Sequence, residues 1–320
     1  MLLSFPRTQM KRAREPDVSE IVGVRGVSRA ALERIVSALS RQDAGRSAAA
    51  LTRQAHEQRW AKVATCLKMP SVDGGMVDWH LCHPNRMLAL LVEESPALQT
   101  WLRDAFRRVP CTPLRPWSLL VGFDEYVPGS KLAPIKSRKT MCLSFSFEEL
   151  SPQLHLDSAW FTPAAVLTTT MHKVEGGWSA MLRAFLSLQL LGPTGLSTAG
   201  LPLVLGDEAH ILFARIGTVL SDGDGLRQAL QWSGAGGLRP CFRHPNVLMK
   251  NSDRAGRQGG DDYVEIGCAD PSRFASWTRE SLASAVRMTL EKREQLGHRR
   301  GVSTELDRMA KAFGFAFTKD

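Results

Sequence analysis

The order of the segments after residue 117 constrains the fold of this chain more than any other feature. Three β-type segments follow one another, an amphipathic helix comes next, and a fourth β-type segment runs into an acidic Gly-rich turn. These five segments are 117–123, 139–147, 160–174, 176–192 and 209–220. Strands and a helix in this order predict an α/β domain in which helices flank a mixed sheet.

Acidic residues stand at the ends of the first and fourth of these strands. The strand order resembles the first half of the RNase H-like fold, in which those two strands lie side by side and carry two carboxylates. Here Asp124 ends the first strand and Asp222 follows the fourth, while Asp224 is a rival to Asp222 because the Gly turn is flexible. Two neighbouring carboxylates can hold two Mg²⁺ or Mn²⁺ ions about 3.5–4 Å apart for phosphodiester chemistry. The open alternative is that these acids are ordinary polar strand ends and turns.

The N-terminal part of the chain is basic, and its periodicity is helical. We expect one helix over 26–42, with Ser28 as its N-cap, and a second helix over 47–68. A solvated amphipathic helix is the alternative to a helix that reads DNA. The candidate nucleic-acid contacts are Lys11, Arg12, Arg14, Arg29 and Arg34. The predicted organisation is a basic helical region over 1–70, a helical linker region over 71–116 that is interrupted near Pro96, and an RNase H-like core over 117–320.

The excess of positive charge favours a polyanionic partner. Lys and Arg number 41 against 32 Asp and Glu, which gives a net charge of +9. Such a chain tends to associate with nucleic acid at low salt. No apolar run reaches the roughly 18 residues of a membrane helix, and the start lacks the charge order of a secretory signal. We therefore expect an intracellular protein without a membrane partner, whose six cysteines are free buried thiols.

Six short blocks of sequence occur in one order. They are FDEYVPG, RKTMCLSFSFEEL, VEGGWSAMLRAFL, LSDGDGLRQAL, SGAGGLRPCFRHPNVL and YVEI. Together they resemble transposase-like proteins of mobile elements expanded in some protist genomes, which are similar in turn to cut-and-paste DDE/D transposases with an RNase H-like core. The resemblance covers about residues 76–317. It implies DNA as partner, a nuclear location, Asp124 as the first catalytic acid, and Asp222 or its rival Asp224 as the second.

The same resemblance implies a structural zinc pair after the second acid, where related transposases often carry Cys-x-x-Cys or Cys-x-x-His. Cys241 and His244 match that spacing, and Cys268 is a candidate third ligand. Structural zinc takes four ligands, so this set is incomplete. Another closely spaced group is more typical of a turn than of a site: His80, Cys82 and His83.

The third acid of such enzymes is expected on a helix beyond the position where this sequence ends, which favours a truncated copy. The leading interpretation is a DNA transposase-like protein, active or decayed, that cleaves and transfers DNA strands with metal ions; a homo-oligomer is compatible with it. The alternative is a non-catalytic nucleic-acid-binding remnant of a mobile element. A small-molecule α/β enzyme is disfavoured, because the chain lacks GxxxxGK[ST], GxSxG and HExxH motifs.

Overall fold

The computed structural model describes residues 57–130, 133–232, 234, 239–249, 263–265, 267–296 and 313–314. Contacts divide the chain into two units, Met1–Ala64 and Thr65–Asp320. In the first unit, a helix spans residues 57–63. The helix expected over 26–42 and the five expected nucleic-acid contacts (Lys11, Arg12, Arg14, Arg29 and Arg34) lie outside the described residues.

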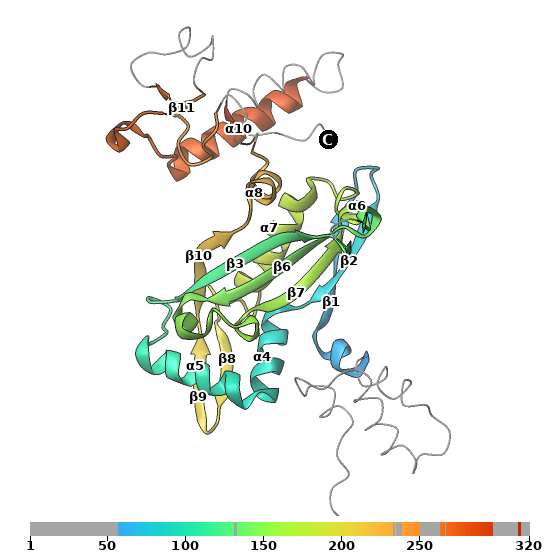
Figure 1. The fold of residues 1–320 in the computed structure, drawn as a ribbon, viewed down its shortest axis with the longest axis vertical. Coiled ribbons are helices and arrows are strands. Elements are labelled where there is room, and N and C mark those ends of the chain that lie inside the picture. Colours follow the sequence, from blue (N-terminus) through green and yellow to red (C-terminus); the bar gives the residue numbers. More distant parts are fainter. Residues whose placement is uncertain are drawn as a thin grey trace, which may run out of the picture. The chain divides into compact units, whose positions relative to one another are not determined.

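A four-stranded mixed sheet forms the centre of the second unit (Figure 1). Its strands, in spatial order, are β10 (Ala214–Leu220), β3 (Trp117–Tyr126), β6 (Thr140–Phe147) and β7 (Phe161–Leu167). β6 is antiparallel to both β3 and β7, whereas β10 is parallel to β3. The expectation of an α/β fold with a mixed sheet flanked by helices is confirmed, and so is the adjacency of the first and fourth predicted strands.

The two faces of this sheet differ because successive side chains of a strand point to opposite sides. On one face, Phe123 pairs in register with Leu143, and both are buried. Helix α7 (Gly177–Leu190) covers this face, and its Trp178 ring lies 5.5 Å from the Phe123 ring. On the other face, Gly122 pairs with Ser144, and both are only half-buried. The small and polar residues of β3 and β6 therefore leave a hollow on that face.

Two helices precede the sheet, α4 (Pro84–Glu94) and α5 (Pro96–Arg108). The predicted interruption near Pro96 is confirmed, because Ser95 separates the helices and its hydroxyl accepts a hydrogen bond from Leu98 N at 3.3 Å. α5 packs against the start of β3, where the Phe106 and Trp117 rings lie 4.5 Å apart. Trp117 is fully buried, and its indole N–H donates to a backbone carbonyl, so this contact anchors the sheet.

A β-hairpin occupies a region that the sequence predicted as helix and turn. Its strands are β1 (Ala64–Pro70) and β2 (Met76–Cys82). The prediction of a helix to residue 68 is wrong beyond residue 63. The interpretation of residues 80–83 as a turn is also wrong, because they span the end of β2 and the N-cap of α4. The physical reason is burial with period two: alternate residues of β2, Trp79 and Leu81, pack inward.

The predicted strand over 209–220 is in fact two strands. β8 (Leu201–Leu205) and β9 (Glu208–Leu212) form a separate hairpin, and β10 begins after Phe213. Phe213 leaves the hairpin ladder because its carbonyl accepts from Trp117 N at 2.9 Å and its N–H meets the Cys111 sulfur at 3.1 Å. The predicted strand over 160–174 likewise ends at Leu167, where α6 begins.

Short elements complete the described part of the chain. These are β4 (Gly129–Ser130), β5 (Ala133–Pro134), α6 (Thr168–Met171), α8 (Gly223–Leu230), β11 (Val247–Leu248), β12 (Val264–Glu265) and α10 (Arg279–Leu296), with 3₁₀ turns at Lys136–Arg138, Glu148–Gln153, Asp157–Ala159 and Pro271–Arg273. All six cysteines are free, but only Cys82 is buried, so the expectation of buried thiols is wrong for the other five. None of the helices in the described ranges combines the length and hydropathy needed to cross a bilayer.

Candidate functional site

The parallel pairing of β3 and β10 places two of the predicted acids at equivalent positions. Leu220, the last residue of β10, pairs in register with Gly122 of β3. Two residues further along each segment stand Asp222 and Asp124. Parallel strands run in the same direction, so an equal step along both keeps the two residues beside each other and on one face. The register therefore brings together acids that are far apart in the sequence.

Asp124 and Asp222 line one cavity of about 440 Å³ on the less covered face of the sheet. Cys142, Ser144 and Trp160 also line it. Gly122 lies at its base, where an added Cβ would stand 3.7 Å from a ring carbon of Trp160. The cavity exists because β3 and β6 contribute small side chains here, and because Trp160 forms a wall instead of filling the space.

Local hydrogen bonds orient both carboxylates. Asp222 is the N-cap of α8, and its Oδ1 accepts from Gly225 N at 2.7 Å. Asp124 Oδ1 accepts from Glu125 N, also at 2.7 Å. Within the described part of the chain, neither carboxylate takes part in an ion pair. Two oriented negative charges thus face one cavity, and no cation of the described residues pairs with either.

The neighbouring acids are arranged differently. Glu125, the next residue of β3, points to the opposite face, where it forms an ion pair with Lys139. Asp224 lies 3.4 Å from the Arg227 guanidinium. Both acids line a second cavity of about 550 Å³, on the side of Trp178 and α8. Of the two candidates for the second acid, Asp222 therefore shares a cavity with Asp124, and Asp224 does not.

A cysteine lies beside Asp124 at this cavity. Cys142 pairs in register with Asp124. Burial raises the pKa of the Cys142 thiol above its ordinary value of 9.0, and the Asp124 carboxylate raises it further. Mg²⁺ is a hard cation that takes oxygen ligands, so a thiol is not expected among its ligands. The donors left at the cavity are carboxylate and hydroxyl oxygens, the ligands that Mg²⁺ prefers.

The predicted zinc pair is brought together, without a third ligand among the described residues. Cys241 Sγ lies 3.3 Å from His244 Nδ1. Cys268, the expected third ligand, instead points its thiol at the backbone oxygen of Asp270, at 3.7 Å. In the ranges that the structure covers, no third Cys, His, Asp or Glu atom forms a compact group with the pair.

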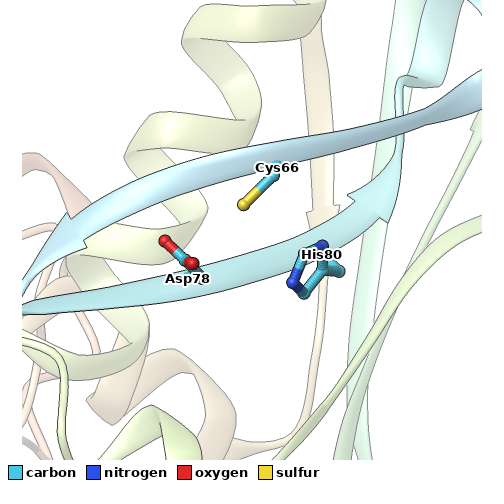
Figure 2. Close-up of side chains that lie close together, drawn as sticks. All are labelled: Cys66, Asp78 and His80. Atoms are coloured by element: carbon cyan, nitrogen blue, oxygen red, sulfur yellow. The ribbon is translucent and has the colours of Figure 1, made fainter.

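Three other residues do form such a compact group, on the β1–β2 hairpin (Figure 2). Ligand atoms of Cys66, Asp78 and His80 all lie within 4.8 Å of one another. Sequence reasoning missed this group because it grouped His80 with Cys82 and His83, both of which are buried. The signal was present in the spacing of Asp78 and His80, which puts both on one face of a strand. Reading it required knowing that the segment is a strand.

No protein-family model matches this chain. The search of curated proteins likewise gave no match. The functional assignment therefore rests on the residues and geometry of the chain itself, and the resemblance to transposase-like proteins stays a prediction.

Two further residues at the acidic cavity carry no sequence signal of their own. Trp160 donates its indole N–H to Leu154 O at 3.0 Å, which holds the ring at the cavity wall. Ser221 precedes Asp222, and its buried hydroxyl has no hydrogen-bond partner among the described residues. Their proximity to the acids follows from tertiary packing, so a sequence pattern could not have indicated it.

Proposed function

We propose that this chain is a DNA transposase-like protein, in which Asp124 and Asp222 bind Mg²⁺ or Mn²⁺ for cleavage and transfer of DNA strands. One observation carries the proposal. Asp124, near the end of β3, and Asp222, two residues after β10, line the same cavity, and among the described residues neither carboxylate has a cationic partner. The neighbouring acids differ, because Glu125 is paired with Lys139 and Asp224 with Arg227.

The strand arrangement supports an RNase H-like core. Three consecutive antiparallel strands, β3, β6 and β7, are followed by α7 and then by β10, which returns parallel to β3 on its outer side. A parallel return of this kind needs a crossover connection, and α7 lies within it. The consequence is that the two acid-bearing strand ends come together at one edge of the sheet.

Electrostatics favours a divalent cation in this cavity. Two carboxylates at neighbouring strand ends repel each other, and a bound cation converts that repulsion into attraction. A pair of such ions would activate the attacking water or 3′-hydroxyl and stabilise the leaving oxygen. The chain's own contribution is to orient both carboxylates through hydrogen bonds from Glu125 N and Gly225 N.

DNA is the substrate that the charge of the chain supports. The net charge of +9 favours a polyanion, and Trp160 offers an aromatic wall beside the acids on which a base or sugar can pack. Contacts to phosphates release counterions, so affinity should fall steeply between about 50 and 200 mM salt. A DNA substrate also makes the nucleus the expected location.

A second candidate function has its own supporting observation. Among the described residues, two carboxylates line this cavity, Asp124 and Asp222, whereas DDE/D chemistry uses three acids. Binding of DNA and metal without cleavage is therefore the alternative. The two functions differ in a single measurable property, the nicking of DNA by the metal-loaded protein.

The proposal is tested with Mn²⁺, whose binding to the full chain can be followed by electron paramagnetic resonance. We expect Asp124→Asn and Asp222→Asn each to weaken Mn²⁺ binding at least tenfold. The matched controls are Asp224→Asn, whose carboxylate is paired with Arg227, and Asp157→Asn, which is exposed outside the cavity; both should bind as the wild type does.

Nicking of supercoiled plasmid DNA by the same proteins distinguishes activity from binding alone. Nicking by the wild type that is lost in Asp124→Asn supports the enzyme, and metal binding without nicking supports the alternative. Equal Mn²⁺ affinities for Asp124→Asn and Asp157→Asn would refute both.

A further inference from the structure

One face of the β1–β2 hairpin carries three different metal-binding side chains. Asp78 and His80 are two residues apart on β2, so they share a face, and Cys66 comes from the neighbouring strand β1 (Figure 2). Their ligand atoms lie within 4.8 Å of one another. All three residues are exposed, so an ion from solution can reach them directly.

The hairpin that presents these ligands is held firmly. Its opposite face buries Trp79 and Leu81, which anchors β2. At the turn, Ser71 N donates to Gly75 O at 3.0 Å, and the Ser71 hydroxyl donates to Lys173 O at 3.0 Å. A site built on anchored strands is more precise than one on a loop, so side-chain rotations are the main adjustment that an ion would require.

We propose that Cys66, Asp78 and His80 bind one zinc ion, with a fourth position open to water or to a further ligand. Zinc–sulfur, zinc–nitrogen and zinc–oxygen bonds of about 2.0–2.3 Å in a tetrahedron place ligand atoms about 3.3–3.6 Å apart. Side chains whose ligand atoms already lie within 4.8 Å reach that spacing by small rotations. A thiolate and a carboxylate together also balance the double charge of the ion.

The donor set selects zinc over the ions expected at the acidic cavity. Mg²⁺ and Mn²⁺ take oxygen ligands, whereas a thiolate and an imidazole suit zinc. Three protein ligands plus an open position is the arrangement of zinc sites that act on a ligand, while closed structural sites use four protein ligands. None of the three residues lines the cavity of Asp124 and Asp222. The hairpin site is therefore separate from the proposed DNA-cleaving site, and either can be wrong without the other.

The test uses Co²⁺, which replaces zinc and produces a near-ultraviolet charge-transfer band when a thiolate binds it. The full chain, freed of metal and kept reduced with a non-thiol phosphine, is titrated with Co²⁺ and then with Zn²⁺. We expect one equivalent of Co²⁺ with a thiolate band, displaced by one equivalent of Zn²⁺. Cys66→Ser should abolish the band, and Asp78→Asn and His80→Gln should each weaken Co²⁺ binding at least about tenfold. Loss of a residue that only supports a ligand already weakens metal binding by about tenfold or more, so loss of a ligand should cost at least as much.

The matched control is the other cysteine–histidine pair. Cys241→Ser and His244→Gln remove a thiol and an imidazole that lie 3.3 Å apart but lack a third close ligand in the described ranges. Both variants should keep the band. A band that survives Cys66→Ser, or one that disappears in Cys241→Ser, overturns the proposal. Because all three hairpin ligands are exposed, their replacement leaves the fold intact, which far-ultraviolet circular dichroism checks.

Discussion

Replacing Asp124 with Asn tests the idea that two like charges face each other across the β3–β10 pair. The substitution keeps the shape of the side chain and the oxygen that accepts from Glu125 N, so it removes the charge alone. Without divalent ions, the wild type carries the repulsion between Asp124 and Asp222, and the variant does not. We therefore expect Asp124→Asn to be the more stable protein under those conditions.

The size of this effect follows from the strand geometry. Adjacent strands lie about 4.8 Å apart. The two acids stand just beyond the last paired residues, Leu220 and Gly122, so we take about 5 Å as the separation of their carboxylates. At that distance, two unit charges repel by about 0.8 kcal/mol in water and by about 3 kcal/mol at an effective dielectric constant of about 20. Both acids are exposed, so the lower figure applies. We expect Asp124→Asn to raise the free energy of unfolding by about 0.5–1 kcal/mol at low ionic strength, and less as salt screens the charges.

Saturating Mg²⁺ should reverse that order. An ion that binds the folded state alone, at a hundred times its dissociation constant, adds about 2.7 kcal/mol to the free energy of unfolding. The wild type should gain this stabilisation, and the variant should lose most of it. Urea unfolding followed by circular dichroism, with either EDTA or Mg²⁺, measures all four values.

The control for this experiment is Glu125→Gln, the neighbouring acid that is already paired with Lys139. It should lose stability slightly and respond to Mg²⁺ as the wild type does. The reasoning is refuted if Asp124→Asn is less stable than the wild type in EDTA. It is also refuted if Mg²⁺ stabilises both proteins equally.

Three further predictions concern pH and packing. Burial lowers the pKa of His83 below 6.5, so the unfolded state takes up a proton first as pH falls. The free energy of unfolding should therefore decrease below about pH 6.5. His83→Asn should make the urea midpoint depend less on pH between about 7.5 and 5.5. Burial raises the pKa of Glu149 above 4.5, so the buried carboxyl lowers the free energy of unfolding as pH rises through that value. Between about pH 4.5 and 6.5, the free energy of unfolding should therefore fall less in Glu149→Gln than in the wild type. An added Cβ at Gly225 would lie 2.0 Å from Ser221 Oγ, so Gly225→Ala should lower the free energy of unfolding by about 1–3 kcal/mol and weaken Mn²⁺ binding. Gly223→Ala, where a Cβ meets nothing within 4 Å, is its control; equal melting temperatures for the two variants would contradict the packing argument.

Much of the sheet could be predicted because its signals are local. The alternation of β6, with Met141, Leu143 and Phe145 buried, is visible in the sequence as period two. The helix after Gly176 was expected from its amphipathic pattern and its Gly-Gly start, and Gly176 does adopt a positive φ of 75° there. The hairpin of β1 and β2 was missed because its strands are short and because its inward residues are recognised only by what they pack against.

The candidate site residues, too, could be predicted only in part from the sequence. Asp124 and Asp222 were identified because strand order implied that β3 and β10 are neighbours, which the pairing confirms. The choice between Asp222 and Asp224 could not be made from the sequence, since both lie in one Gly-rich turn. It depends on the start of α8, where Asp222 becomes the N-cap and Asp224 turns toward Arg227.

The sequence by itself determined the order of the four sheet strands and of α7, the alternation that makes one sheet face apolar, and the acids near the ends of two strands. These properties depend on residues close together in the chain, where backbone periodicity and turn chemistry decide the outcome. Only the tertiary structure decided which acids share a cavity, where Trp160 stands, and that Cys66 faces Asp78 and His80. Those relations depend on strand register and on packing between segments, and a shift of one residue in register would move each side chain to the other face of its sheet.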